Sequence, residues 1–474
     1  MALKAVIGLE MHCELKSNSK VFSSSKNSYE KDANVNISAI DLAFPGVLPV
    51  LNKECVRKSL MMSIALNCSL PEYIYFDRKN YYYPDLPKGY QITQSHDPVG
   101  VDGEVIIECN KEERKIRIHD IHLEEDTASL DHVFDSSFID YNRAGVPLLE
   151  LVTEPCIYSA DEAVAFLEHI KRIYQYCDIS DADSKKGQIR CDVNVSMMEE
   201  DAKELGTRVE VKNINSFSSV YDAIVYEINR QSELINSGRG DEIVQETRRF
   251  DEESGTTKRM RSKEDAIDYK YFVEPNIPKY KVSKEWVEEI SSCIPELPLD
   301  RKKRYIKEYG LSDYDANIII KEKDYADYFE KCISLGMDAK ESANWIIVNI
   351  LAYINKLDIS INDLFITPEK LKVIIDAKEK GAISSKQAKE IFVKVIEDKK
   401  EPIEYIKDNS QISDKEELIK IIDDILLKSE SQIEAYKAGR SNLFDYFVGQ
   451  VMKNTRGKAN PVMTKEILNE KLNG

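Results

Sequence analysis

The sequence predicts an α+β fold, with sheet-forming segments in the first part of the chain and helical segments in the rest. Up to about residue 294, several stretches alternate between apolar and polar residues, as strands with one buried face do. From about Pro295 this alternation stops, and helical patterns follow that are separated by glycines and prolines. A further change near Ser410 precedes the last helices. We therefore predict three domains, over residues 1–294, 295–410 and 411–474.

Composition restricts the class of protein. The chain has 474 residues, of which 42% are hydrophobic and 32% charged, and no apolar run is long enough to span a membrane. Glu10 comes too early for the apolar core of a signal peptide. The nine cysteines are scattered without a Cys-x-x-Cys pair, which argues against a zinc ribbon or a disulfide framework. The net charge of −18 does not favour a chain coated in nucleic acid. We expect a cytoplasmic protein without membrane contacts.

The first predicted strand covers residues 5–15, where every second residue is apolar. Glu10 and His12 project from its other face, about 7 Å apart along the strand. A half-exposed antiparallel strand has this pattern, and so does a strand whose polar face binds a divalent cation.

A helix and an ordered loop are predicted next. Residues 53–66 have helical spacing of apolar side chains after the rigid turn at 45–52. Residues 76–94 contain prolines, a glycine and many tyrosines, which exclude a helix and predict an ordered loop that holds charged groups. Such a loop is either functional or simply packed on a sheet.

Residues 117–126 concentrate charge, with two histidines and four carboxylates in ten residues. Neighbouring carboxylates repel each other, so this stretch is either a solvated strand end or a cation-binding segment.

Two more strands with polar faces are predicted at residues 189–197 and 207–213, joined as a hairpin. Arg190 and Asp192 lie on the polar face of the first of these strands, and Glu210 on that of the second. If both strands join that of Glu10, one sheet face carries carboxylates, a histidine and cations, which suits Mg²⁺ with a phosphorylated substrate.

Helices are predicted on either side of this hairpin. Ser159 and Glu162 form a capping-box pattern before one helix, and residues 220–235 have the apolar stripe of another. The charged stretches 245–250 and 258–263 follow, as a strand edge or as phosphate contacts.

Basic residues gather near the end of the acidic chain, either as ordinary charged helix ends or as a nucleic-acid contact. They are Lys437, Arg440, Lys453, Arg456 and Lys458. The sequence contains no Walker loop and no Gly-x-Gly-x-x-Gly, so any nucleotide is bound in another way.

Several motifs together resemble one known family. They are GLEMH at 8–12, FPGVLPVLN at 44–52, the whole of 76–94, IHLEED at 121–126, DYNRAGVPL at 140–148, RCDVNVS at 190–196, QETR at 245–248 and GKANP at 457–461. The chain resembles, from end to end, the B subunits of the aspartyl/glutamyl-tRNA(Asn/Gln) amidotransferases.

The resemblance implies a cradle-shaped catalytic domain with an antiparallel sheet, an all-helical domain and a small helical tail that contacts tRNA. It implies a heterotrimer with an amidase A subunit and a small C subunit. The A subunit makes ammonia from glutamine and delivers it to the B subunit. There ATP and Mg²⁺ are used to phosphorylate the side-chain carboxylate of misacylated Glu-tRNA(Gln) or Asp-tRNA(Asn), and ammonia displaces the phosphate.

The resemblance also carries site residues. Positions that match the metal and phosphoryl site are Glu10, His12, Glu125, Asp192 and Glu210, and Lys79 matches a lysine of the same cavity. We expect Lys79 or Arg190 to neutralise the developing phosphate charge, and the five basic residues of the tail to bind tRNA.

Three departures from the family mark a divergent paralogue. The zinc-binding cysteines of many members are missing between the first strand and Pro45, so we expect no zinc. Thr127-Ala128-Ser129 stands where the family usually has Ala-Gly-Lys, and residues 268–276 also differ. These changes bear on rate, amino-acid preference and activity rather than on the fold.

Two other functional classes compete with this interpretation. One is a tRNA-binding scaffold subunit that has lost phosphoryl transfer. The other is a self-standing ATP-dependent ligase with its own ammonia source. The sequence disfavours the second, because it contains neither an amidase pattern of lysine with paired serines nor a Cys/His glutaminase pattern.

Overall fold

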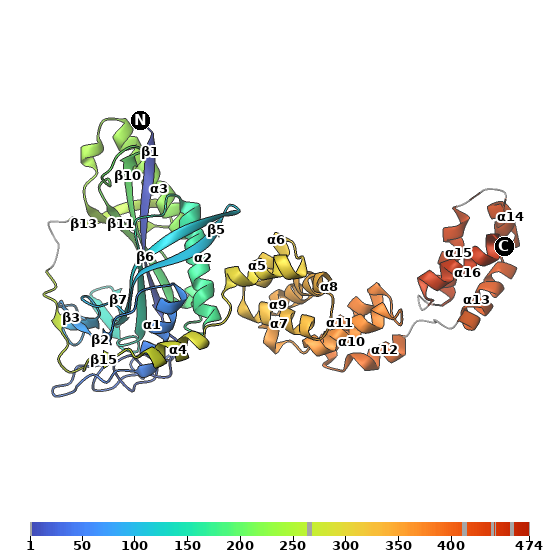
Figure 1. Cartoon of the computed structure of the whole chain (residues 1–474), viewed down its shortest axis with the longest axis horizontal. Helices are drawn as coiled ribbons and strands as arrows, with labels where there is room; N and C mark the ends of the chain where they lie inside the picture. Colours follow the sequence, from blue (N-terminus) through green and yellow to red (C-terminus); the bar gives the residue numbers. More distant parts are fainter. Residues whose placement is uncertain are drawn as a thin grey trace. The chain divides into compact units, whose positions relative to one another are not determined.

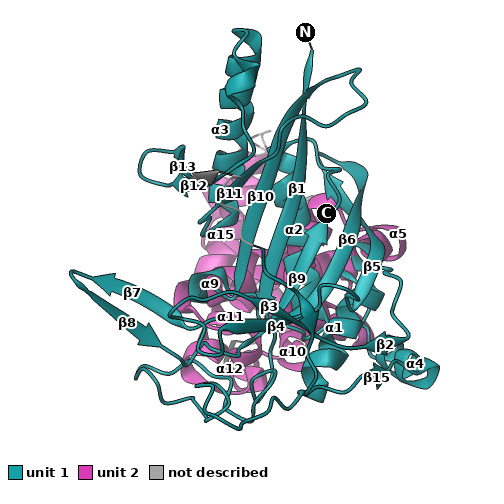
Figure 2. Ribbon diagram, turned by 90° about the vertical axis from the view of Figure 1, so that its left-hand side faces the viewer, with its two compact units in different colours: residues 1–301 teal, residues 302–474 magenta. Residues whose placement is uncertain are grey.

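The structure is a computed structural model that describes residues 2–262, 268–409, 415–437, 440, 442–455 and 459–473. The chain divides into two compact units, residues 1–301 and 302–474 (Figures 1 and 2). The first is built on a large sheet and the second from helices, which confirms the predicted α+β class. Within the described ranges, no helix combines the length and the apolar character needed to cross a membrane.

An eight-stranded sheet organises the first unit. Its strands are β1 (Leu3–Glu14), β5 (Gly100–Cys109), β6 (Glu112–Glu125), β9 (Pro147–Thr153), β10 (Ile189–Glu199), β11 (Val209–Lys212), β12 (Glu246–Asp251) and β13 (Thr256–Ser262). They lie in the order β13-β12-β11-β10-β1-β9-β6-β5, so that the first strand of the chain is central (Figure 2). The predicted hairpin of β10 and β11 is present, and β10 pairs with β1 along eleven positions.

The sheet is mixed rather than wholly antiparallel, which corrects one expectation. The strands β11 and β12 run parallel, whereas the other neighbouring pairs are antiparallel. Between β11 and β12 the chain forms the helix α3 (Phe217–Asn236). A helical crossover returns the chain to the same end of the sheet, so the following strand must run parallel to the preceding one.

Three helices cover one face of the sheet, namely α1 (Lys53–Ala65), α2 (Ala160–Tyr176) and α3. Each begins at the polar side chain of an N-cap residue, Asn52, Ser159 or Ser216, that accepts a hydrogen bond from a backbone N–H of the first turn. Their apolar stripes pack on the odd-numbered residues of β1, of which Ile7 is fully buried. The predicted helices and the core face of the first strand are thereby confirmed.

The tyrosine-rich stretch 76–94 differs from the continuous loop that the sequence predicts. It contains β3 (Asp77–Asn80) and β4 (Tyr90–Thr93), which pair with each other and with β14 (Phe272–Val273) in a three-stranded sheet. The prolines lie in the connection between the strands, where they remove no ladder hydrogen bond. Pairing with a strand so far away in the chain leaves no local sequence signal.

Further short strands and one further helix belong to the first unit. They are β2 (Tyr73–Ile74), β7 (Ser129–Val133), β8 (Ser136–Asp140), β15 (Tyr280–Lys281) and α4 (Lys284–Ser292). The strands β7 and β8 form a hairpin, and β15 pairs with β2.

In the described part of residues 302–473 the named elements are all helical. They are α5 (Pro298–Tyr309), which begins before the boundary, α6 (Asp313–Ile319), α7 (Lys323–Ser334), α8 (Ala339–Asn344), a π-helical turn (Trp345–Ile350), α9 (Leu351–Leu357), α10 (Pro368–Glu379), α11 (Ser385–Asp398), α12 (Pro402–Asn409), α13 (Lys415–Leu427), α14 (Glu430–Lys437), α15 (Leu443–Asn454) and α16 (Pro461–Asn473). Buried apolar residues form one cluster between 305 and 406 and another between 418 and 472. The division into three domains stays a prediction.

Gly103 of β5 lies where α1 and its following turn approach the sheet. A Cβ atom at this position would lie 2.4 Å from Cys68 Sγ and 2.8 Å from the backbone oxygen of Leu66. We expect Gly103→Ala to lower the free energy of unfolding of the sheet unit by about 1–3 kcal/mol, because backbone must shift to admit the methyl group. Calorimetry of the full chain measures this change.

The matched control is Gly8→Ala on β1, where an added Cβ meets nothing closer than 3.9 Å. Its free energy of unfolding should change by less than about 0.5 kcal/mol. Equal stability of the Gly103 variant and the parent would contradict the close approach at β5.

Candidate functional site

Strand alternation places acidic side chains on the open face of the central sheet. In β1 the odd residues enter the core, so Glu10 and His12 lie on the other face. The register sets Glu10 beside Asp192 of β10, and His12 between Arg190 of β10 and Glu150 of β9. The sheet thus brings together residues that are far apart in the sequence.

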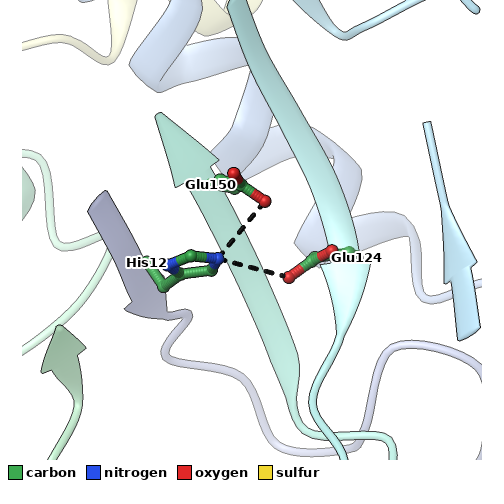
Figure 3. Close-up of side chains that lie close together, drawn as sticks. All are labelled: His12, Glu124 and Glu150. Carbon is green, nitrogen blue, oxygen red and sulfur yellow. Dashed lines mark ion pairs between the residues drawn. The ribbon is translucent and has the colours of Figure 1, made fainter. Parts of the chain in front are cut away.

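The first of two acidic groups on this face consists of His12, Glu124 and Glu150, contributed by β1, β6 and β9 (Figure 3). His12 Nε2 lies 3.3 Å from Glu150 Oε2 and 3.9 Å from Glu124 Oε1. One potential ligand atom of each residue lies within 4.8 Å of the others. The three side chains converge on one point, where a cation can be held.

His122 of β6 contacts this first group through Glu150. Its Nε2 lies 2.9 Å from the same Oε2 atom of Glu150, and its Nδ1 lies 2.8 Å from Asp120 Oδ1. Side chains with this geometry fix each other's orientation, as outer partners do around metal ligands.

Charge in the first group is divided unequally between the two glutamates. Burial alone would raise the pKa of Glu150, but the charges of His122 and His12 outweigh it and hold that pKa well below its usual value. Glu124 is also buried, and burial together with the charge of Glu150 raises its pKa. Burial alone would lower the pKa of His12, but the hydrogen bond and charge of Glu150 raise it. The contact between His12 and Glu150 thus favours the charged form of both side chains.

The second group consists of Glu10, Asp192 and Glu210, whose potential ligand oxygens also lie within 4.8 Å of one another. Lys212 Nζ lies 2.5 Å from Asp192 and 2.9 Å from Glu210. Asn194 Nδ2 donates to Glu10 at 2.9 Å. Burial would raise the pKa of Glu210, but the charge of Lys212 lowers it. A lysine thus supplies the positive charge that this carboxylate set requires.

An open pocket of about 440 Å³ is lined by the whole first group and by Asp192 of the second group. Cations from three strands line it, namely Lys79, Arg190 and Lys212. Arg190 is held by a hydrogen bond of 3.2 Å to Asp126, a buried carboxylate that also pairs with Arg143. Lys79 Nζ lies over the ring of Tyr269, 4.9 Å from its centroid. Acidic and basic groups therefore face one space, as binding of a metal and a phosphate requires.

Most of the predicted catalytic and metal-binding residues lie in or next to this pocket. Glu10, His12, Lys79, Arg190, Asp192 and Glu210 belong to the two groups or to the pocket lining.

Glu125 joins neither acidic group. Its carboxylate pairs with Lys88 and accepts a hydrogen bond of 2.9 Å from the backbone N–H of Ile92. Adjacent residues of a strand point to opposite sides, so Glu124 rather than Glu125 faces His12.

Glu124, Glu150 and Lys212 are not among the predicted site residues. Glu150 is the one carboxylate in the apolar stretch 147–153 of β9, and that isolation is a usable signal. A second signal is that Glu124 lies two residues after His122 in β6 and therefore on the same face of the strand. The sequence does not show that β9 lies next to β1, because their pairing depends on the topology of the whole sheet.

The charged stretches after α3 form β12 and β13 at one edge of the sheet. Arg248 lies 2.7 Å from Glu246 and 3.2 Å from the buried Glu227, and Arg259 lies 2.9 Å from Glu246. Both arginines are paired with carboxylates of this chain, although the Arg259 side chain is exposed, and this pairing favours the strand-edge interpretation over phosphate contact. Lys263 lies outside the described residues.

Three of the five basic tail residues can be placed. Lys437 ends α14, Lys453 is in the last turn of α15, and Arg440 lies between these helices, all with exposed side chains. Arg456 and Lys458 lie outside the described residues.

Comparison with known proteins identifies the family. Residues 5–288 match the model of the GatB/GatE catalytic domain, and residues 327–472 match that of the GatB domain. The aspartyl/glutamyl-tRNA(Asn/Gln) amidotransferase subunits B of Persephonella marina and Oceanobacillus iheyensis are each 44% identical to this chain, and that of Bacillus mycoides is 43% identical. The similarity covers 100% of this chain and 100% of each relative. This chain therefore belongs to the family of aspartyl/glutamyl-tRNA(Asn/Gln) amidotransferase B subunits.

Proposed function

We propose that this chain is the subunit that activates the side-chain carboxylate of Glu-tRNA(Gln), Asp-tRNA(Asn) or both in a glutamine-dependent amidotransferase. The observation that carries the proposal is a cation-lined pocket that the whole first acidic group and Asp192 of the second group also line. In the proposed assembly, an amidase A subunit supplies ammonia and a small C subunit completes a heterotrimer. ATP is the second substrate, and the reaction class is ATP-dependent carbon–nitrogen ligation.

The donor atoms fit Mg²⁺ as a cofactor. Five carboxylates and one histidine offer hard ligands, with no thiolate among them, and this set suits Mg²⁺ or Mn²⁺. Glu10, Asp192 and Glu210 would hold one ion, and His12, Glu124 and Glu150 another. Such ions supply charge neutralisation at phosphate oxygens. On this assignment Glu124 takes the place that motif resemblance gives to Glu125, because Glu125 faces Lys88.

Activation is needed because a carboxylate is a poor acyl donor. In the proposed reaction its oxygen attacks the terminal phosphorus of ATP, and ADP leaves. Ammonia then attacks the acyl carbon, and phosphate leaves with the electron pair of the broken C–O bond. Positioning and charge stabilisation account for most catalysis of phosphoryl transfer.

The cations of the pocket supply part of this charge stabilisation. Lys79 and Arg190 line the pocket together with the acidic residues, and Lys212 reaches it from β11. Asp126 keeps the Arg190 guanidinium in place without neutralising it alone, because it shares its charge with Arg143. We propose that Lys79 and Arg190 contact the transferred phosphate.

A scaffold without phosphoryl transfer is the alternative that the test must exclude. The Thr127-Ala128-Ser129 departure motivates this alternative, since a family lysine is missing beside the site. The complete acidic groups favour the active enzyme, because repulsion between carboxylates is costly to maintain without use.

We expect Glu150→Gln to reduce amide formation by the assembled enzyme by about 100-fold or more, because it removes the charge shared by His12 and His122. Glutaminase activity of the assembly should be retained. The measurement is tRNA-dependent ATP cleavage together with amide yield.

Glu104→Gln is the matched control, since Glu104 is an exposed strand residue of β5 that pairs with the exposed Lys115. Its activity should equal that of the parent. Unchanged tRNA-dependent ATP cleavage in the Glu150 variant would contradict the proposed site, and a parent that cleaves no ATP would favour the scaffold.

For the tail, we expect the triple change of Lys437, Arg440 and Lys453 to alanine to weaken tRNA binding. Removal of each phosphate-binding cation should flatten the slope of log K against log salt by about one unit or slightly less. The experiment measures binding of misacylated tRNA by the assembled enzyme over a range of salt concentrations, and ATP affinity should stay unchanged.

Lys386→Ala is the control for the tail, because this α11 lysine is 87% exposed and lies in the other helical cluster of the chain. The control should keep both the affinity and the salt slope. If the triple variant kept them as well, the tail would not be a tRNA-binding surface.

A further inference from the structure

Lys79 of β3 differs from the other cations that line the 440 Å³ pocket, because no carboxylate of the described residues forms an ion pair with it. Arg190 is held by Asp126, and Lys212 pairs with Asp192. Each of these two cations is partly neutralised by a carboxylate of the protein itself. The charge of Lys79 is not offset in this way and is open to a ligand.

Aromatic rings take the place of a carboxylate beside Lys79. Its Nζ lies 4.9 Å from the ring centroid of Tyr269 and 6.0 Å from that of Tyr81. These two rings are 5.8 Å apart at 74°, and Tyr271 continues the edge-to-face row 6.1 Å from Tyr269. Burial raises the pKa of Tyr81, so its hydroxyl keeps its proton. The rings attract an ammonium group through their π faces and carry no negative charge that would neutralise it.

Backbone hydrogen bonds hold Tyr269 in this place, although it lies far from Lys79 in the sequence. The backbone N–H of Asn80 donates to the carbonyl oxygen of Tyr269 at 2.9 Å, and Asn80 Nδ2 donates to that of Lys270 at 2.7 Å. The strand β14 then begins at Phe272 and pairs with β3. Because Lys79 also belongs to β3, the ring and the ammonium group are fixed to the same small sheet.

A lysine at this position needs such support, because its surroundings are acidic. Glu124, Asp126 and Glu150 line the same pocket. Burial raises the pKa of Glu124 and the charge of Lys79 opposes that shift, so the ammonium group acts on the first acidic group without pairing with it. A flexible lysine stem that was not held elsewhere would turn to one of these carboxylates, and its charge would be offset in an ion pair.

We propose that Tyr269 is a positioning residue, whose ring holds the Lys79 ammonium group at the pocket with its charge free for the transferred phosphate. The inference rests on the proposed function and adds a residue to it. Tyr269 acts through Lys79 alone. The aromatic ring performs this task and the hydroxyl does not, so Tyr269→Phe and Tyr269→Leu should behave differently.

The first test compares these two variants in the assembled enzyme, with glutaminase activity as the check on assembly. Tyr269→Phe keeps the ring and should keep the parent kcat for tRNA-dependent ATP cleavage. Tyr269→Leu removes the ring and should lower that kcat by about threefold to thirtyfold, the range of a cation–π contact, with an unchanged KM for tRNA. Tyr158→Leu is the matched control, because Lys4 lies 3.8 Å from the centroid of that ring and neither residue lines the pocket. Its kcat should equal that of the parent.

A double-mutant cycle tests whether Tyr269 acts through Lys79. In the Lys79→Met background, the addition of Tyr269→Leu should change kcat by less than about twofold, because the contact is already absent. Multiplication of the two losses would overturn the proposal. A parent-like kcat in Tyr269→Leu, or equal losses in Tyr269→Phe and Tyr269→Leu, would overturn it as well.

A second measurement does not depend on activity. The lysines of the full chain are given isotope-labelled methyl groups, and the magnetic resonance signal of Lys79 is the one that Lys79→Arg lacks. The ring should shift this signal upfield in the parent and in Tyr269→Phe, and the shift should disappear in Tyr269→Leu. An unshifted Lys79 signal in the parent overturns the proposal. A shifted signal in a parent that cleaves no ATP would contradict the proposed function and leave the contact between Tyr269 and Lys79 standing.

Discussion

Repulsion between carboxylates is the constraint on which the open face of the sheet depends. Glu10, Asp192 and Glu210 share one small volume, and Glu124 and Glu150 share another. Positive groups placed by the same strand alternation offset this repulsion. Lys212 lies beside Asp192 and Glu210, and His12 and His122 lie beside Glu150. Because the opposite face is the hydrophobic core, a shift of one residue in β1 would exchange the two faces. Core packing thus holds the charged face in register.

This arrangement gives the site two properties that phosphoryl transfer requires. Ligands on paired strands are held rigidly, so their positions need little reorganisation when charge develops. The positive groups are two histidines and the flexible side chain of Lys212. A bound cation can replace them, because a histidine can lose its proton and the ammonium group of Lys212 can move away. Lys79 and Arg190 lie outside both acidic groups and remain available for the substrate side of the pocket.

Those parts of the fold that depend on local periodicity could be predicted from the sequence. The alternation in residues 5–15 and 189–197 predicted β1 and β10 and the faces of Glu10, His12 and Asp192. It did not predict β3 and β4, whose partner strand lies far away in the chain. Nor did it predict the parallel step from β11 to β12, which follows from the crossover by α3.

For the site, the sequence could not decide which of two adjacent residues faces the cluster. Motif resemblance pointed to Glu125, whereas the structure places its neighbour Glu124 next to His12. Which of the two faces His12 depends on the register of β6 on β9. The isolation of Glu150 in an apolar strand is a signal that a solvated position also gives, and the pairing of β9 with β1 distinguishes the two.

The central claim is that the two acidic groups hold separate divalent cations on one sheet face. Its most direct test is the number of Mn²⁺ ions bound by the full chain, measured by electron paramagnetic resonance for the parent and for variants at Glu124 and Glu210. The account predicts two sites in the parent, with Glu124→Gln losing one and Glu210→Gln losing the other. Mn²⁺ binding that is absent from the parent, or identical in the parent and both variants, would contradict it.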